Sequence, residues 1–302
     1  MPLEIRTYNE LEGGADLGDQ VARQQQRVDH RLESIAAVIA VMSGKGGVGK
    51  SLVTAALATA LASSGRRVGV VDADLNGPSL VRLLGVEPEA LPTSGGSVEP
   101  ARTIDGIALM SMGLLVRDGE ALGWREPEGA GFVWRGAQER GALREFLADV
   151  AWGELDLLLV DLPPGTGRLV ELHEMVPDLA GTVAVTIPTP ASGDAVARSI
   201  ELSRRRGIEV VGIVSNMEGA RCGACGVIGP LHSGSAADEL AERFDAPVIA
   251  RIPLDPALGR AADEGALGRW LAGTDDTRAR IVELAETVGR VVDAARRAGR
   301  SA

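Results

Sequence analysis

The chain is poor in aromatic residues and cysteine. Aromatic residues make up 3% of the 302 positions, so a core must be built from Ala, Val, Leu and Ile. Two cysteines exclude a disulfide framework. No apolar run approaches the roughly 20 residues of a membrane-spanning helix, and the first residues lack the apolar segment of a secretion signal. We therefore expect a cytoplasmic protein without a membrane span, in a reducing compartment where paired cysteines favour metal or redox chemistry.

The chain also lacks a positive charge balance. Its 42 acidic and 31 basic residues give a net charge of −11, which argues against nucleic acid as a partner. Hydrophobic residues reach 45%, enough for a sizeable core, and this excludes disorder over the whole length.

Lysine is nearly absent. Of the 31 basic residues only Lys45 and Lys50 are lysines, and they lie within six residues of each other. A general preference for arginine explains the other positions but not these two. Because an ammonium and a guanidinium are not interchangeable, both positions require a compact point charge.

Short β-branched runs alternate with alanine-rich helical stretches from residue 35 onward. Strands separated by helices predict an α/β fold, with a mostly parallel twisted sheet flanked by helices. We expect a polar N-terminal tail and solvent-exposed helix over 1–34 and one domain over 35–302. Residues 276–297 predict an amphipathic helix packed on the sheet, with a membrane-surface helix as the alternative, and 113–135 predict a long functional loop. The predicted strands are 35–42, 68–71, 107–110, 157–160, 182–187, 208–214 and 247–252, and the other predicted helices are 51–64, 138–150, 168–177, 192–206 and 236–243.

Residues 44–51 read GKGGVGKS and fit the phosphate-loop pattern G-x-x-x-x-G-K-[ST], between a predicted strand and a predicted helix. Glycines let successive backbone N–H groups point at phosphate oxygens, and the helix N-terminus adds its positive end. We predict that Lys50 binds the β- and γ-phosphates and that Ser51 is a ligand of Mg²⁺. The predicted ATP cradle consists of Gly44, Lys45, Gly46, Gly47, Val48, Gly49, Lys50 and Ser51.

Carboxylates follow two of the predicted strands. Asp72 and Asp74 come after the strand at 68–71, and Asp161 follows the strand at 157–160. Carboxylates at strand ends that face a phosphate loop can hold Mg²⁺ and orient the attacking water. Asp161 is the predicted magnesium-linked aspartate, and the Pro-Pro-Gly-Thr-Gly turn after it is where a γ-phosphate sensor would lie.

Cys222 and Cys225 form a C-x-x-C pair in which a glycine follows each cysteine. Such a pair alone indicates a redox pair, half a zinc site or half a cluster site. The chain has no other cysteine, and its three histidines form no constellation, so one copy cannot supply four thiolates. Two copies can, which predicts an iron–sulfur cluster bridging a homodimer. Four thiolates suit [2Fe–2S] or [4Fe–4S], and we favour [4Fe–4S].

The loop SGKGGVGKS, with Lys45 as its extra lysine, resembles the deviant Walker A loop of the MinD/ParA, nitrogenase iron protein and Mrp/ApbC class. From about residue 35 to 265 the chain resembles the Mrp/ApbC iron–sulfur carrier ATPases. The motifs that carry this resemblance are the phosphate loop, DADLNGPS at 72–79, WRG at 134–136, DLPPGTG at 161–167, the Asn216-Met217 pair, the C-x-x-C pair and RIPLD at 251–255.

The resemblance implies roles for single residues. Lys45 would reach the nucleotide of a partner subunit, which points to a homodimer independently of the cysteines. Asp74 would position the attacking water, with Asp72 closer to Mg²⁺. Asn216 would contact the adenine, and Pro253 would bind nucleotide from the I-P-L-D turn.

The function implied is a slow ATPase, with Lys45, Lys50 and Asp74 as catalytic residues, that transfers a cluster to apo iron–sulfur proteins. Two alternatives remain: a MinD/ParA-like positioning ATPase and a nucleotide-binding scaffold that does not hydrolyse ATP. A nitrogenase-reductase-like electron donor fits less well, because its two cysteines lie far apart in sequence.

The chain departs from the family pattern at three places. The cysteine motif lacks the usual proline after Cys222, and Ala137 replaces the expected proline after WRG. Arg168 stands where an aspartate usually follows Gly-Thr-Gly. This last change reverses a charge beside the sensor turn, so we expect altered switching, and the scaffold alternative depends on it.

Overall fold

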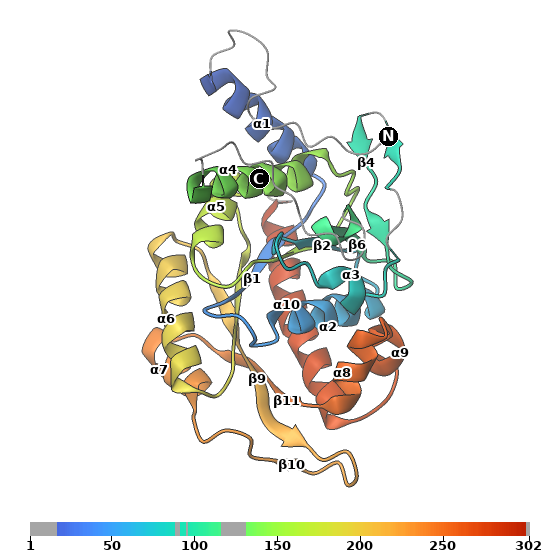
Figure 1. Ribbon diagram of the computed structural model, residues 1–302, viewed down its shortest axis with the longest axis vertical. Helices are drawn as coiled ribbons and strands as arrows, with labels where there is room; N and C mark the ends of the chain where they lie inside the picture. Colours follow the sequence, from blue (N-terminus) through green and yellow to red (C-terminus); the bar gives the residue numbers. More distant parts are fainter. Residues whose placement is uncertain (1–16, 88–90, 95, 116–130, 300–302) are drawn as a thin grey trace.

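A nine-stranded sheet forms the centre of the protein (Figure 1). The computed structural model describes residues 17–87, 91–94, 96–115 and 131–299. The strand order is β10-β9-β8-β1-β7-β2-β6-β5, and β11 pairs with β9. The strands are β1 (Val38–Ser43), β2 (Val68–Asp72), β5 (Ala101–Arg102), β6 (Ala108–Ser111), β7 (Leu157–Asp161), β8 (Gly181–Thr186), β9 (Val210–Arg221), β10 (Ile228–Gly229) and β11 (Val248–Leu254).

Most of the sheet is parallel. β1 lies between β7 and β8 and runs parallel to both, whereas the short strands β5 and β10 are antiparallel to their neighbours. β3 (Thr93–Ser94) and β4 (Ser97–Val98) form a separate two-stranded sheet. The predicted α/β fold class is therefore confirmed.

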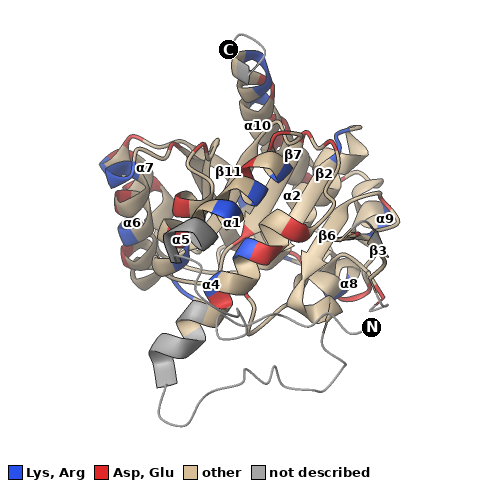
Figure 2. Cartoon of the chain, turned by 90° about the horizontal axis from the view of Figure 1, so that it is seen from above, with Lys and Arg blue, Asp and Glu red and all other residues tan. Residues whose placement is uncertain are grey.

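Helices cover both faces of the sheet. Successive residues of β1 face opposite sides: Ile39 and Val41 join one buried cluster, and Ala40 and Met42 join the other. The first face carries α2 (Lys50–Ser63), α3 (Leu80–Leu83), α8 (Pro256–Asp263), α9 (Leu267–Leu271) and α10 (Asp276–Gly299). The second carries α1 (Leu17–Leu32), α4 (Gly131–Asp149), α5 (Gly167–Met175), α6 (Pro190–Arg205) and α7 (Ala236–Phe244). The charged residues lie mostly on these helices (Figure 2).

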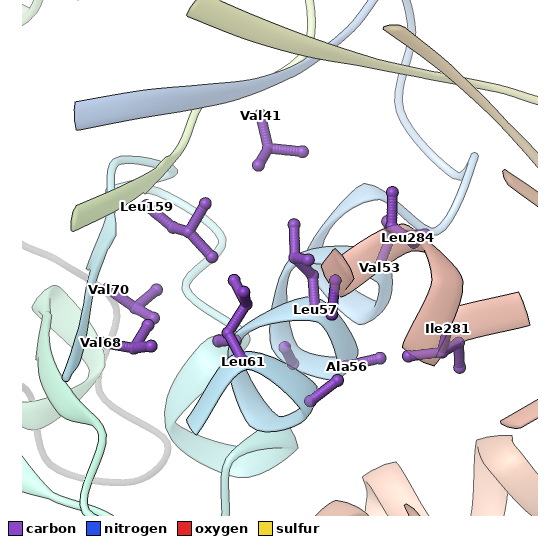
Figure 3. Packing of buried hydrophobic residues seen from close by; sticks show 14 of the residues in the cluster. Val41, Val53, Ala56, Leu57, Leu61, Val68, Val70, Leu159, Ile281 and Leu284 are labelled. Carbon is purple, nitrogen blue, oxygen red and sulfur yellow. The ribbon is translucent and has the colours of Figure 1, made fainter. Parts of the chain in front are cut away.

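Helix α2 fills the space between the sheet and α10. Ten of its residues are buried, and most of them are alanine, leucine, valine or threonine. These small side chains let the helix pack closely without aromatic residues. In Figure 3, Val53, Ala56, Leu57 and Leu61 lie among strand residues Val41, Leu159, Val68 and Val70 and the α10 residues Ile281 and Leu284.

The predicted C-terminal helix packs against the protein itself. In α10, Ile281, Leu284, Val288 and Val292 are fully buried, and the helix contacts α2 and β11. Its far end is held by an ion pair between Asp293 and Arg66, at 2.8 Å. The packing of α10 is therefore confirmed, and its apolar face is not free for a membrane surface. Within the described ranges, no helix is long and apolar enough to cross a membrane.

Three expectations need correction. The N-terminal helix is not wholly solvent-exposed, because it packs on α4 and Val28 is fully buried. The strand expected at 208–214 continues to Arg221, because its polar second half pairs with β11 and β10. Of the loop expected at 113–135, residues 131–135 belong to α4, whereas 116–130, like the tail at 1–16, lie outside the described residues.

Candidate nucleotide and cysteine sites

The phosphate loop connects the end of β1 to the start of α2, as its pattern predicts. Gly47 and Gly49 have φ of +79° and +76°, a left-handed conformation that residues with a side chain rarely adopt. A Cβ on Gly44 would lie 2.1 Å from the backbone carbonyl carbon of Ala195 in α6. The glycines therefore allow both the bend of the loop and its close approach to α6.

Lys50, Ser51 and Asp161 converge behind this loop. The Lys50 ammonium lies 2.6 Å from Oδ2 of Asp161, and the Ser51 hydroxyl donates to the same oxygen at 2.6 Å. The other carboxylate oxygen accepts a hydrogen bond from Thr54, also at 2.6 Å. Asp161 is fully buried and Lys50 is 6% exposed, so this is a buried and well-satisfied ion pair.

Sequence reasoning missed Thr54. Its position one turn after Lys50 places its hydroxyl on the same helix face, and it also donates to the Lys50 carbonyl at 3.1 Å. The available signal was a polar residue in a helix of alanine and leucine, directly downstream of the phosphate loop.

Asp72 lies beside Asp161 in the sheet, since the two are register partners on β2 and β7. Its carboxylate accepts hydrogen bonds from the backbone N–H groups of Ser79 and Leu80, each at 3.2 Å, and from the Ser111 hydroxyl at 3.1 Å. Burial, together with repulsion from Asp161, raises the pKa of Asp72 to about 7. Asp72 thus holds the loop at 73–79 in shape, while its predicted role near Mg²⁺ stays a prediction.

Asp74 stands in that loop and is partly buried. Its backbone N–H donates to Asp72 at 3.2 Å. Burial raises the pKa of Asp74, and the charges of Lys50 and Arg168 oppose this rise. The carboxylate therefore lies within electrostatic reach of the phosphate loop, where the predicted water-positioning role would be performed.

Asn216 connects β9 to the phosphate loop. Its side-chain amide donates to the Val48 carbonyl at 2.8 Å, and a Cβ on Gly49 would lie 2.3 Å from the same amide nitrogen. Pro253 is buried in β11, and its neighbour Ile252 is the register partner of Asn216. The pairing of β9 with β11 therefore places Pro253 directly after the register partner of Asn216, and the contact of both residues with adenine stays a prediction.

Lys45 differs from Lys50 in its surroundings. It is partly exposed, and among the described residues its ammonium has no hydrogen-bond or ion-pair partner. Only its backbone carbonyl is engaged, by the Ser43 hydroxyl at 3.1 Å. The structure thus leaves this charge available to a phosphate or to another molecule.

Cys222 and Cys225 lie in the turn between β9 and β10, and both are exposed. The N–H of Cys222 donates to the Val227 carbonyl and the N–H of Gly226 donates to the Cys222 carbonyl, each at 2.9 Å. Gly226 has φ of +76°, so the tight turn uses the glycine that the sequence offers there. Hydrogen bonds from the backbone N–H groups of Cys225 and Ala224 lower the pKa of the Cys222 thiol.

The described part of the chain does not complete the metal-ligand set of the cysteine pair. Among the described residues, no group of three or more His, Cys, Asp or Glu side chains could hold a metal ion. The hairpin extends to one end of the molecule (Figure 1). One strand connects this hairpin to the phosphate loop. Asn216 of β9 is bonded to the loop, and the same strand ends at Arg221, which directly precedes Cys222.

A parallel sheet with a phosphate loop between its central strand and the next helix defines a P-loop NTPase. The chain belongs to the ParA family described as the NUBPL iron-transfer P-loop NTPases, whose model matches residues 34–289. The predicted resemblance to iron–sulfur carrier ATPases of this class is thereby confirmed.

Two curated proteins and two solved structures show what this chain is similar to. The iron–sulfur cluster carrier protein of Methanocaldococcus jannaschii is 37% identical over 81% of this chain and 82% of its own length. The cytosolic Fe–S cluster assembly factor NUBP2 of Homo sapiens is 38% identical over 78% of this chain and 85% of its own length. The nucleotide-binding protein of Archaeoglobus fulgidus in complex with ADP has a TM-score of 0.68 at 37% identity, covering 82% of this chain and 93% of that one. The cell division ATPase MinD of Pyrococcus furiosus, with a TM-score of 0.58 at 22% identity over 85% of this chain and 99% of its own, shows the shared fold alone.

Proposed function

We propose that the chain is an ATP-hydrolysing iron–sulfur cluster carrier that works as a homodimer and delivers its cluster to apo iron–sulfur proteins. The observation that carries this proposal is the single strand β9, which is bonded to the phosphate loop through Asn216 and ends at the exposed cysteine pair. In this proposal residues 35–302 form one NTPase domain with both sites, and 1–34 form an N-terminal tail and helix.

The phosphate loop and the aspartates fit ATP and Mg²⁺. Ser51, Asp72 and Asp161 offer the hydroxyl and carboxylate oxygens that Mg²⁺ prefers, and Ser51 and Asp161 are already 2.6 Å apart. Bound Mg²⁺ would neutralise charge on the phosphates. The ADP complex of the 37% identical Archaeoglobus fulgidus protein supports nucleotide binding by this loop.

Individual residues then have distinct tasks. Lys50 holds the β- and γ-phosphates, and Asp74 orients the attacking water. Asn216 can accept a hydrogen bond from the base through its side-chain oxygen, because only its nitrogen is used on Val48. Pro253, which follows the register partner of Asn216 in β11, contributes to nucleotide binding from that strand. Lys45, whose ammonium has no partner among the described residues, reaches the nucleotide of the second copy.

The cluster is cargo, held between two copies. Each copy supplies Cys222 and Cys225, so two copies supply the four thiolates of a [4Fe–4S] cluster. Exposure of both cysteines suits a cluster that has to leave. Similar proteins named as iron–sulfur carriers and cytosolic assembly factors support apo iron–sulfur proteins as acceptors and a cytoplasmic location.

Coupling between the sites follows from the path of β9. Nucleotide binding rearranges the phosphate loop, and the Val48 carbonyl transmits this to Asn216 and so to the strand that carries the hairpin. A ligand shifts such an equilibrium only by its difference in affinity for the two arrangements. ATP therefore changes cluster retention only if the protein binds ATP more tightly with the hairpin in one position than in the other.

The test combines two variants and two measurements. Anaerobic reconstitution with iron and sulfide should load wild type with about four iron atoms per dimer, and Cys222→Ser/Cys225→Ser should bind none. Phosphate release from ATP should be lost in Lys50→Ala and retained in the cysteine variant. Iron binding should in turn survive in Lys50→Ala, which makes each variant the control for the other.

The outcomes separate the alternatives. A wild type that stays colourless but hydrolyses ATP would refute the carrier function and favour a positioning ATPase. A wild type that binds iron but releases no more phosphate than Lys50→Ala would refute hydrolysis and leave a nucleotide-binding scaffold.

A further inference from the structure

Arg168 lies at the start of α5, immediately after the Pro-Pro-Gly-Thr-Gly turn. Its guanidinium forms ion pairs with Glu139 of α4 and with Glu171 one turn further along α5. The Arg168 and Glu139 side chains are only 14% and 12% exposed. The charge reversal noted in the sequence is therefore neutralised by two carboxylates.

The network continues to the loop that carries Asp74. The second carboxylate oxygen of Glu139 accepts a hydrogen bond from the Asn76 side-chain amide at 2.7 Å. Asn76 stands two residues after Asp74 in the loop at 73–79. Arg168, Glu139 and Asn76 thus connect the turn after Asp161 to the loop after Asp72, two segments far apart in the sequence.

We propose that Arg168 is a positioning residue that, through Glu139 and Asn76, holds the Asp74 loop and the 163–167 turn in one fixed arrangement for ATP hydrolysis. This inference rests on the proposed ATPase function. A guanidinium suits the task because its planar fork can engage two carboxylates at once, whereas an ammonium is a point charge. An aspartate at position 168 would instead repel both carboxylates.

A second ion pair joins the same two helices and separates positioning from simple helix packing. Arg140 of α4 pairs with Glu174 of α5 at 2.7 Å, and both side chains are over 40% exposed. In the described part of the chain, neither Arg140 nor Glu174 forms a hydrogen bond or ion pair with the Asp74 loop. Arg140→Gln therefore removes an α4–α5 ion pair without removing a connection to Asn76, and serves as the matched control.

The first experiment measures steady-state ATP hydrolysis. Arg168→Gln should lower kcat by about tenfold to a hundredfold, because small displacements of positioning groups cost this much. KM for MgATP should change less than about twofold, because the phosphate loop itself is untouched. Arg140→Gln should leave both constants unchanged. A merely structural role of Arg168 would not predict this separation of kcat from KM.

The second experiment measures hydrogen–deuterium exchange of residues 73–79 and does not depend on hydrolysis. Exchange there should become faster in Arg168→Gln and stay unchanged in Arg140→Gln. The charge exchange Arg168→Glu/Glu139→Arg should recover part of the protection lost in Arg168→Glu, since the ion pair reforms and the Asn76 amide can turn its oxygen toward an arginine.

Two results would overturn the positioning role. One is that the 73–79 loop exchanges as slowly in Arg168→Gln as in wild type. The other is that Arg168→Gln and Arg140→Gln change kcat, or exchange of this loop, by equal amounts. Wild-type phosphate release no higher than that of Lys50→Ala would instead refute the proposed ATPase. In that case the exchange measurement still decides whether Arg168 holds the loop.

Discussion

The phosphate loop and the cysteine hairpin are joined by one strand but are built in opposite ways. Behind the phosphate loop, Asp161 is fully buried and receives three side-chain donors at 2.6 Å. At the other site, Cys222 and Cys225 are exposed, and the turn that holds them is closed by backbone hydrogen bonds. The first site is organised within one chain, and the second presents ligands outward.

The ionisable groups show the same contrast. Burial raises the pKa of Asp72 to about 7, which disfavours its charged form. At the exposed hairpin, backbone N–H donors lower the pKa of Cys222 and favour the thiolate that binds metal. The nucleotide site is thus organised in advance, whereas the cysteine site is open. In the proposed function this open site is the cargo site, which iron and a second copy would complete.

The largest effect is expected from Asp161→Ala. The variant leaves the buried Lys50 ammonium without its counter-ion and removes the acceptor of Ser51 and Thr54. Breaking a buried pair in this way should lower the free energy of unfolding by about 3–5 kcal/mol in urea denaturation.

Two comparisons give this prediction its control. Asp293→Ala breaks the partly exposed Arg66 pair at 2.8 Å and should cost no more than about 1 kcal/mol. Asp161→Ala/Lys50→Met removes both charges and should recover part of the loss. Equal losses of unfolding free energy for Asp161→Ala and Asp293→Ala would mean that the Asp161–Lys50 ion pair does not organise the phosphate-loop site.

The nucleotide site was more predictable from sequence than its supports, for a physical reason. The phosphate loop is encoded within eight consecutive residues, so spacing alone places Lys50 and Ser51 between a strand and a helix. The Arg168–Glu139–Asn76 network joins three segments that only the folded chain brings together, and no local pattern encodes it. The second half of β9 was not predicted because a hairpin that extends outward needs no apolar residues. The strands β3, β4, β5 and β10 were not predicted either, because they are too short to show a periodic pattern of apolar residues.

Gly49→Ala and Gly226→Ala compare the two sites at almost the same backbone geometry, since both residues have φ of +76°. At Gly49 the new Cβ would lie 2.3 Å from the Asn216 amide nitrogen and displace it from the Val48 carbonyl. Backbone strain and the lost bond together should cost about 2–4 kcal/mol.

At Gly226 the nearest atom to the new Cβ is the end of the Arg221 side chain, 3.3 Å away, which can move. Only the backbone strain remains, so Gly226→Ala should cost about 1–2 kcal/mol. Urea denaturation of both variants measures the difference. A smaller loss for Gly49→Ala than for Gly226→Ala would show that Asn216 does not hold the phosphate loop.

The lowered pKa of the Cys222 thiol should be measurable as a shift in the pH dependence of its reactivity. Cys222 should react with iodoacetamide with a midpoint pH below that of an ordinary thiol, because backbone N–H groups stabilise its charged form. Peptide mapping by mass spectrometry as a function of pH measures this midpoint for Cys222. In urea these hydrogen bonds are lost and the midpoint should rise, and an identical midpoint in native and unfolded protein would contradict the prediction.

The smallest effect is expected from Cys222→Ser/Cys225→Ser in metal-free, reducing buffer. Both side chains are exposed, and the two 2.9 Å hydrogen bonds that close the turn belong to the backbone, which serine retains. The free energy of unfolding should therefore stay within about 0.5 kcal/mol of wild type. After reconstitution with iron and sulfide, wild type alone should gain stability, because a ligand that binds only the folded state stabilises it by mass action. A loss above about 1 kcal/mol without metal would make the cysteines part of the fold, and the contrast between an organised nucleotide site and an open cargo site would fail at its second half.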